Sequence, residues 1–205
     1  MRGKAKENRV NFEVFRKNFL ENHSGFSYFR RKSRMSNIPF DPASPAVRRL
    51  LSNLNSSFRV RLFFLLKLPS LLFWKVRVAS VDPDIGKVEI RFSWRTQNPF
   101  QSTYFAALAG TGELSTGMLA MVAMEGRGPM SMLVTRLEGQ YSKRGLGRTV
   151  FTCEDGPKIR EAVDRAYATG EGQEVEVLSI GRGEDGTEVC RFLLNWSFKP
   201  RRKKD

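Results

Sequence analysis

Histidine is almost absent from this chain, and the only one, His23, lies in an irregular basic stretch near the N-terminus. A Ser-His-Asp triad and a histidine metal site both need a histidine held inside a folded domain. The sequence also lacks a P-loop and a GxGxxG turn placed after a strand. These absences argue against triad hydrolases and nucleotide-binding enzymes, and we expect neither a metal nor another cofactor.

Cysteine is scarce too, because the chain has only Cys153 and Cys190, both within strand-like stretches. Their spacing fits neither a zinc site nor a disulfide framework, which favours a reducing cytoplasm. The longest apolar run, residues 62–74, is interrupted by Lys67 and Pro69. It is shorter than the ~20 residues that a membrane-spanning helix needs. We expect an amphipathic helix on one end of the core, with contact to a membrane surface as the less favoured alternative.

Positive charge is abundant but is concentrated in the tails. Of the net charge of +14, residues 1–34 contribute +7 and residues 199–205 contribute +4, which leaves +3 for residues 35–198. Basic tails on a mildly charged domain are usually solvated, so we expect no nucleic-acid partner. A basic protein that binds RNA or a membrane surface through its tails remains a third alternative. Residues 1–34 have no periodic apolar face, and we expect them to be disordered or untranslated, with Met35 as an alternative start.

Helices are expected first and strands afterwards. Residues 35–75 should form a helical segment, in which Ser44-Pro45 opens one helix and Ser56-Ser57 caps a second that breaks at Pro69. From Val76 the apolar period changes to two. Strands are expected at residues 76–81, 87–94, 130–141, 148–154, 173–180 and 187–198, with a helix inserted from 155 to 170. In the second strand, we expect Val88, Ile90, Phe92 and Trp94 to share the buried face.

A long helix is expected between the second and third strands, from about residue 102 to 124. It contains small and apolar residues almost throughout, yet Glu113 stands in its middle. Burying an ionised carboxylate is costly unless it is paired or its pKa shifts, so Glu113 is the main candidate for a functional residue. One long apolar helix and a sheet with one apolar face predict an α+β fold in which an antiparallel sheet wraps around the central helix.

This layout and the helix sequence resemble the hotdog-fold acyl-CoA thioesterase superfamily over about residues 56–198. The chain looks closest to an uncharacterised, thioesterase-like branch that is a domain of unknown function. In phenylacetate-degradation-type thioesterases, an Asn precedes the central helix, a His-Gly pair opens it, and an Asp or Glu follows inside it. Asn98 and Glu113 are similar to that pattern, with Tyr104-Phe105 in place of His-Gly. The resemblance implies a hotdog domain at residues 76–198 that hydrolyses an acyl-CoA or acyl-carrier thioester.

The resemblance also implies roles for individual residues. Glu113 would be the general base or nucleophile, and Asn98 would hydrogen-bond the attacking water or the substrate. Backbone N–H groups at the helix N-terminus would hold the thioester carbonyl. The expected substrate-binding residues are Tyr104, Phe105, Ser115, Thr116 and Arg144. Relatives pair two sheets with sites between the subunits, and a free sheet edge must be covered, so we expect a homodimer or higher homo-oligomer.

Each assignment has a structural alternative. Glu113 could be a buried structural carboxylate, Asn98-Pro99 a local turn, and Tyr104 a core aromatic residue. The hydroxyl groups at positions 115 and 116 could bond back to helix carbonyls, and the loop around Arg144 could be solvated. The main alternative function is a non-catalytic hotdog protein that binds acyl chains or acyl thioesters.

Overall fold

The computed structural model describes residues 39–201. The predicted tail of residues 1–34 and the alternative start at Met35 lie outside this range, as do the last four residues of the chain. At the C-terminal end, the last strand continues to Pro200, two residues into the segment expected to be a basic tail.

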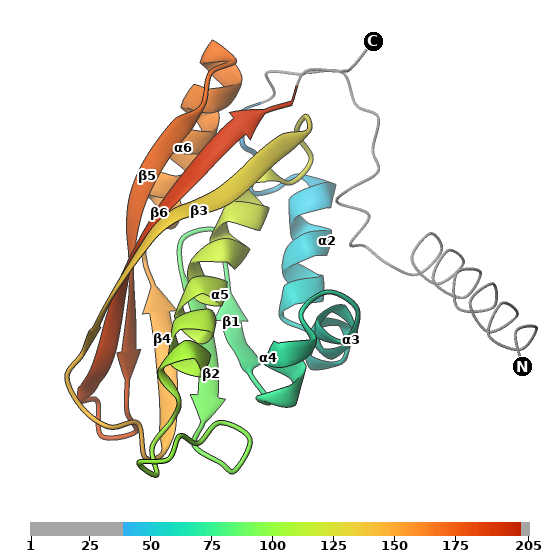
Figure 1. The fold of residues 1–205 in the computed structure, drawn as a ribbon. Coiled ribbons are helices and arrows are strands. Elements are labelled where there is room, and N and C mark those ends of the chain that lie inside the picture. The colour runs from blue at the N-terminus through green and yellow to red at the C-terminus, as the bar shows by residue number, and fades with distance from the viewer. Residues whose placement is uncertain (1–38, 202–205) are drawn as a thin grey trace, which may run out of the picture. The chain divides into compact units, whose positions relative to one another are not determined.

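A six-stranded antiparallel sheet forms the centre of the fold (Figure 1). In spatial order the strands are β1 (Arg77–Val81), β2 (Gly86–Arg91), β4 (Arg148–Cys153), β5 (Gln173–Arg182), β6 (Glu188–Pro200) and β3 (Met130–Tyr141). Strands β1 and β3 are therefore the two edges of the sheet. All six strands predicted from the alternating pattern are present, and with the helices they confirm an α+β fold.

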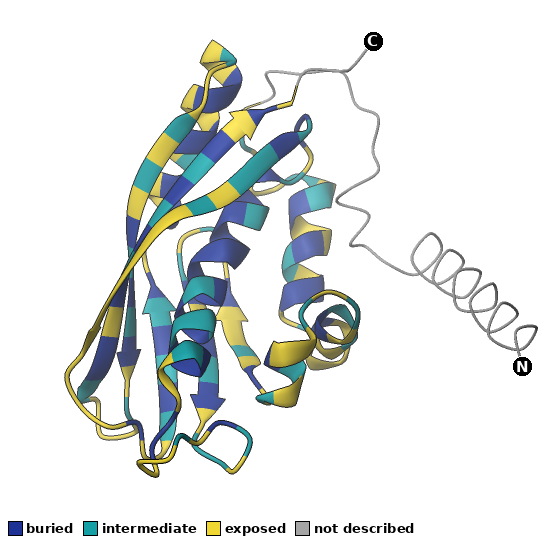
Figure 2. Ribbon diagram, viewed as in Figure 1, coloured by how far each residue is buried: buried dark blue, intermediate teal, exposed yellow. Residues whose placement is uncertain are grey.

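The central helix α5 (Phe105–Met124) packs against β2, β4, β5 and β6, and the sheet curves around it. Most of its residues are buried (Figure 2). Small residues allow this close packing: a β-carbon at Gly112 would lie only 2.6 Å from Cδ2 of Phe192 on β6. Since Phe192 is itself fully buried, the ring has little space to retreat, and glycine is needed at position 112 despite its low helix propensity.

Helix α5 is also long and apolar enough, by length and composition, to cross a membrane, the only such helix within residues 39–201. However, 67% of its most apolar window is buried inside the structure. A helix that is apolar on all sides is expected in the core of a folded domain as well as in a membrane. Its composition is therefore explained by the surrounding sheet.

Within the described residues, three short helices precede the sheet: α2 (Pro45–Leu54), α3 (Ser57–Lys67) and α4 (Pro69–Phe73). The hydroxyl of Ser44 accepts the backbone N–H of Val47 at 3.3 Å, which confirms the predicted N-cap of α2. Ser56 occupies the N-cap position of α3, but its side chain makes no capping hydrogen bond. Helix α2 contacts α5 and β1, α3 contacts β1, and α4 contacts α5. These helices therefore cover the side of the domain near β1 (Figure 1).

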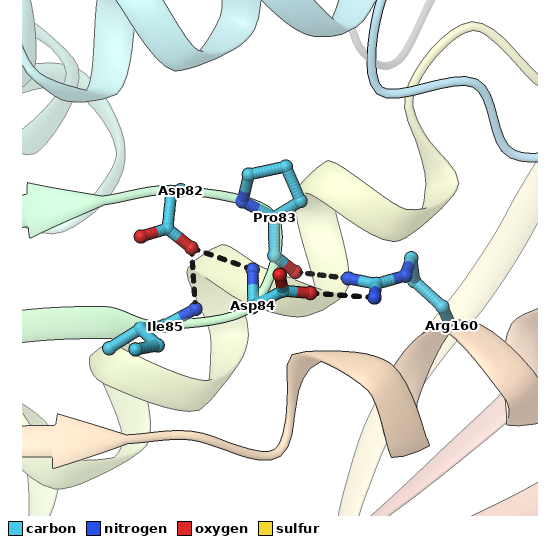
Figure 3. Close-up of polar contacts among 5 residues, drawn as sticks. All are labelled: Asp82, Pro83, Asp84, Ile85 and Arg160. Atoms are coloured by element: carbon cyan, nitrogen blue, oxygen red, sulfur yellow. Dashed lines mark hydrogen bonds and ion pairs between the residues drawn. The ribbon is translucent and has the colours of Figure 1, made fainter.

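Helix α6 (Gly156–Thr169) is the predicted insertion between β4 and β5. One of its arginines holds the β1–β2 turn in place (Figure 3). Arg160 donates one N–H to the carbonyl of Pro83 and another to the carboxylate of Asp84, the latter at 2.6 Å. Within the turn, Oδ1 of Asp82 accepts the backbone N–H groups of Asp84 and Ile85, both at 2.8 Å. The turn and α6 are thus joined although they are far apart in the sequence.

The end of β2 differs from the prediction. The strand stops at Arg91 because the side chain of Thr96 forms a local turn. Its hydroxyl accepts the N–H of Ser93 and donates to the carbonyl of Arg91, both at 2.9 Å. Trp94 lies in this turn and is 66% exposed. The prediction that Trp94 shares the buried face of the strand is wrong, since hydrogen bonds within the turn redirect the chain before Trp94 is reached.

Candidate active site

Glu113 lies in the third turn of α5 and is half-buried. Its carboxylate makes no hydrogen bond or ion pair to any other residue in the described part of the chain. Oε1 lies 3.2 Å from the point that a β-carbon at Gly117 would occupy, and the ring of Trp196 lies 3.6 Å from the same point. The missing side chain at Gly117 therefore leaves space for the carboxylate beside an indole ring.

This environment changes the acidity of the carboxyl group. Desolvation by burial raises the pKa of Glu113 from 4.5 to about 7, because burial favours the neutral form of a carboxyl. Near neutral pH the protonated and ionised forms are then both populated. A carboxylate with such a pKa can accept a proton from water or a substrate more readily than an ordinary surface glutamate.

The hydroxyl groups next to Glu113 do not contact its carboxylate. Thr116 donates its hydroxyl to the main-chain carbonyl of Glu113 at 2.8 Å and accepts the indole N–H of Trp196 at 2.9 Å. Ser115 donates to the carbonyl of Gly112 at 2.8 Å and also lies 2.8 Å from the hydroxyl of Ser179 on β5. These bonds fit the alternative in which the hydroxyl groups of Ser115 and Thr116 bond back to helix carbonyls. They also connect this turn of α5 to the sheet.

Asn98 lies in the loop before α5 and closes a tight turn. Its Oδ1 accepts the backbone N–H groups of Phe100 at 3.0 Å and Ser102 at 3.2 Å. Its side-chain amide donates to the hydroxyl of Ser102 at 3.1 Å. These contacts match the turn that Asn-Pro favours. A substrate could therefore bind the Asn98 side chain only through a donor or acceptor position that these bonds leave unused.

The other predicted residues gather at the N-terminal end of α5. Tyr104 and Phe105 are 42% and 57% exposed, and their rings meet edge to face with centroids 4.8 Å apart. Thr103 donates both its N–H and its hydroxyl to the carbonyl of Gly145, each at 2.9 Å. The loop that contains Arg144 is therefore fastened beside the start of α5. No side chain caps this helix end, so its first backbone N–H groups can donate hydrogen bonds to an external ligand.

A cavity of about 270 Å³ lies between the β3–β4 loop and the tip of the β5–β6 hairpin. Its walls include Lys143, Arg144, Arg148, Glu184 and Asp185. Arg148 is bound by Glu184 at 3.6 Å and by Glu89 at 3.3 Å. In the described residues Arg144 forms no ion pair and is exposed, so it is the better placed of the two arginines to meet an anionic group.

The predicted site is thus divided into two parts along one helix. Phe105 begins α5, and Glu113 lies eight residues further on. At a rise of 1.5 Å per residue, this separation is ~12 Å. A single carbonyl group cannot contact both the helix N-terminus and the carboxylate of the same chain.

The cysteines and potential metal ligands offer no competing site. Cys153 and Cys190 are buried and unpaired, and burial raises the pKa of both thiols to about 12. Reactive thiolates need the opposite shift. Within residues 39–201, no three His, Cys, Asp or Glu side chains lie close enough to hold a metal ion.

Solved structures share this fold at low sequence identity. A proposed thioesterase from Shewanella oneidensis has a TM-score of 0.58 and 10% identity, over 75% of this chain and 99% of that one. A protein of unknown function from Pseudomonas aeruginosa, described as a "probable thioesterase", has a TM-score of 0.59 and 14% identity, over 81% of this chain and 100% of that one. A thioesterase from Haemophilus influenzae has a TM-score of 0.52 and 8% identity, over 71% of this chain and 91% of that one. The chain therefore has a thioesterase-like fold.

No curated protein matches the chain significantly. One family model does match, over residues 58–197, which is more than half of the chain. The matched segment begins in α3 and includes the whole of α5, with Glu113, and nearly all of the sheet. The chain therefore belongs to the family described as Domain of unknown function (DUF4442).

Proposed function

We propose that this protein is a hotdog-fold thioesterase that hydrolyses an acyl-CoA or acyl-carrier thioester, with Glu113 as general base or nucleophile. One observation carries the proposal. A half-buried carboxylate with no partner in the described chain stands on the central helix, and its pKa is raised to about 7. Such a carboxylate is costly to bury, and a role in proton transfer accounts for its retention. The thioesterase-like fold supports the same chemistry.

As a general base, Glu113 takes a proton from water while the water oxygen attacks the thioester carbonyl. The negative charge on the former carbonyl oxygen is stabilised by N–H groups at a helix N-terminus. The C–S bond then breaks, and the sulfur leaves as a thiol with the proton that Glu113 had accepted. As a nucleophile, the carboxylate would instead attack the carbonyl carbon and break the C–S bond, so that an acyl anhydride forms and the sulfur leaves as a thiolate that takes a proton from water. A second water then cleaves the anhydride, which releases the acyl group as a carboxylic acid and restores Glu113.

The separation of ~12 Å along α5 leads us to propose a homodimer with shared sites. The carbonyl next to Glu113 of one copy would be held by the first turn of α5 in the partner. Edge strand β3 is long enough to pair with a second copy, and its exposed Leu133, Leu137 and Tyr141 would be covered. A monomer measured by light scattering at micromolar concentration would rule out the shared site.

The substrate assignment rests on the N-terminal end of α5. Tyr104 and Phe105 offer exposed aromatic surface, and Arg144 is a free cation suited to a phosphate group of a CoA-type carrier. Ser115 and Thr116 would contribute by holding in position the helix turn that carries Glu113. Asn98 would contribute by shaping the loop that precedes α5. We propose a cytoplasmic enzyme without a cofactor, in keeping with its unpaired cysteines.

Release of free thiol from a panel of acyl-CoA esters of different chain length tests the proposal. Glu113→Gln keeps the shape and removes the base, so hydrolysis should fall ~10²-fold or more. Glu161→Gln is the matched control, because Glu161 lies on the surface of α6, paired with Arg165. Equal loss in both variants, or equal activity in Glu113→Gln and the unchanged protein, would contradict the role of Glu113.

The alternative is a non-catalytic protein that binds acyl chains or acyl thioesters. The hydrogen bonds of Asn98 within its own turn favour it, because they occupy an amide that catalysis would use. In that case no ester in the panel would be hydrolysed, a labelled acyl-CoA would still bind, and Glu113→Gln would alter only the stability of the fold.

A further inference from the structure

Charge is unevenly distributed over the domain. Residues 42–81, which form α2, α3, α4 and β1, contain seven Lys or Arg and no Asp or Glu. Residues 82–198, which form the rest of the sheet with α5 and α6, contain 13 Lys or Arg and 16 Asp or Glu. Outside the tails, the excess positive charge therefore comes from the helical side of the domain, while the remainder is slightly acidic.

In the part of the chain that the structure describes, the cations of this segment are also left without anionic partners. Within the described structure, Arg48, Arg49, Arg59, Arg61, Lys67, Lys75 and Arg77 form no ion pair. Elsewhere ion pairs are common, and they include Arg91, Arg127, Arg136, Arg148, Lys158, Arg160, Arg165 and Arg191. The positive charge of residues 42–81 is therefore not neutralised by ion pairs within residues 39–201.

Large apolar side chains are also exposed on α3, on α4 and in the loop after β2. Phe58 and Leu65 are 78% and 57% exposed, and their spacing of seven residues places them on the same side of α3. Phe73 on α4 is 51% exposed and Trp94 66%. The rings of Phe73 and Trp94 meet edge to face at 5.9 Å, and the guanidinium of Arg95 lies 4.8 Å above the Trp94 ring. We call these five residues the α3–α4 face.

We propose that the α3–α4 face docks the protein on the surface of an anionic lipid bilayer. Aromatic and leucine side chains enter the interfacial layer, and the surrounding Lys and Arg interact with anionic headgroups. Each such cation contributes to binding when it lies near an anionic surface. The positive charge of residues 42–81 and the exposed apolar side chains of the α3–α4 face thus both fit an anionic bilayer. This docking does not depend on the proposed thioester hydrolysis.

Other occupants fit this face less well. A second copy that pairs through β3 would leave it uncovered, because β1 and β3 are opposite edges of the sheet and α3 contacts β1 (Figure 1). Single-stranded RNA would also be attracted by the cations and could stack on aromatic rings. However, Leu65 has no ring on which a base could stack, while lipid accepts aliphatic and aromatic groups alike.

Vesicle flotation with the full chain tests the proposal, using phosphatidylcholine vesicles with and without 30% phosphatidylserine. Phe58→Ser/Leu65→Ser removes apolar contact, and Arg61→Gln/Lys67→Gln removes two cations. Binding to the anionic vesicles should weaken roughly tenfold or more in each. Lys87→Gln/Arg182→Gln removes the same charge from the exposed surface of β2 and β5 and should bind as the unchanged protein does. Thermal melting shows that each variant is folded.

The basic tails could also bind anionic vesicles, so the site of contact must be located. Of the three tryptophans, only Trp94 is strongly exposed within the described chain. Lipids brominated on their acyl chains should quench its fluorescence, and Trp94→Phe should abolish that quenching. Three results would overturn the proposal: vesicle binding without quenching, equal binding by all variants, or binding to a single-stranded RNA oligonucleotide but not to vesicles.

Discussion

The carboxylate of Glu113 lies next to Gly117, one turn further along the central helix. Oε1 is 3.2 Å from the position that a β-carbon of residue 117 would occupy, so any larger residue there would disturb the carboxylate. The pair explains why a helix interior retains a glycine at a cost of ~1 kcal/mol relative to alanine. It also makes Gly117 a means of moving the carboxylate without changing its chemistry.

Gly117→Ala should therefore displace the Glu113 carboxylate and lower thioester hydrolysis at least ~10-fold, since misplacement of a catalytic group is costly. Gly110→Ala is the matched control, because its β-carbon would meet Trp74 at 3.4 Å, an ordinary contact. The control should gain up to ~1 kcal/mol of stability, and Gly117→Ala should gain less. Urea denaturation and kcat/KM measure both effects. Equal activity of the two variants would show that the carboxylate does not need its present position.

Stability should depend on pH through Glu113. Its pKa in the folded protein, about 7, is above the reference value of 4.5, so between these values the folded state holds a proton that the unfolded state releases. The free energy of unfolding should fall as pH rises through this window, by up to ~3 kcal/mol. Glu113→Gln lacks this loss and should be more stable than the unchanged protein at pH 8, but not at pH 4.5. Urea denaturation at both pH values gives the free energy of unfolding of the two proteins. A difference between them that does not change with pH would contradict the raised pKa.

Hydrolysis should follow the same titration. Only the ionised carboxylate can act as base or nucleophile, so kcat/KM should rise about tenfold per pH unit below pH 7 and level off above it. The raised pKa of Glu113 sets the position of this change. A profile that levels off already above pH 5 would point to a carboxyl group with an ordinary pKa.

Trp196→Phe should destabilise the fold by ~1–2 kcal/mol, because the indole N–H that Thr116 accepts at 2.9 Å would be lost in a buried place. Trp94→Phe is the control: its ring is 66% exposed, and a surface substitution usually changes stability by less than ~0.5 kcal/mol. Denaturant titration of both variants gives the comparison. Equal stability of the two would mean that the bond to Thr116 contributes nothing.

Much of the fold followed from local pattern. Alternating apolar residues predicted every strand, and Ser44-Pro45 predicted the start of α2, because side-chain periodicity and capping are properties of neighbouring residues. The end of β2 did not follow from the pattern. Trp94 continued the apolar alternation, yet the hydroxyl of Thr96 turned the chain at Arg91, and such a bond competes with the strand without altering the pattern.

The candidate site, like the fold, was predicted from the sequence only in part. The sequence by itself singled out Glu113, because one carboxylate in an otherwise apolar helix must be either partnered or shifted in pKa. Only the tertiary structure decided what surrounds it: Trp196 bonds Thr116 across 80 residues of chain, and Ser179 meets Ser115 across 64. It also decided that Asn98 serves its own turn and that Phe105 lies far from Glu113 along the helix. Contacts of this kind depend on how the sheet curves around α5, which is set by the packing of all the elements together and not by any segment alone.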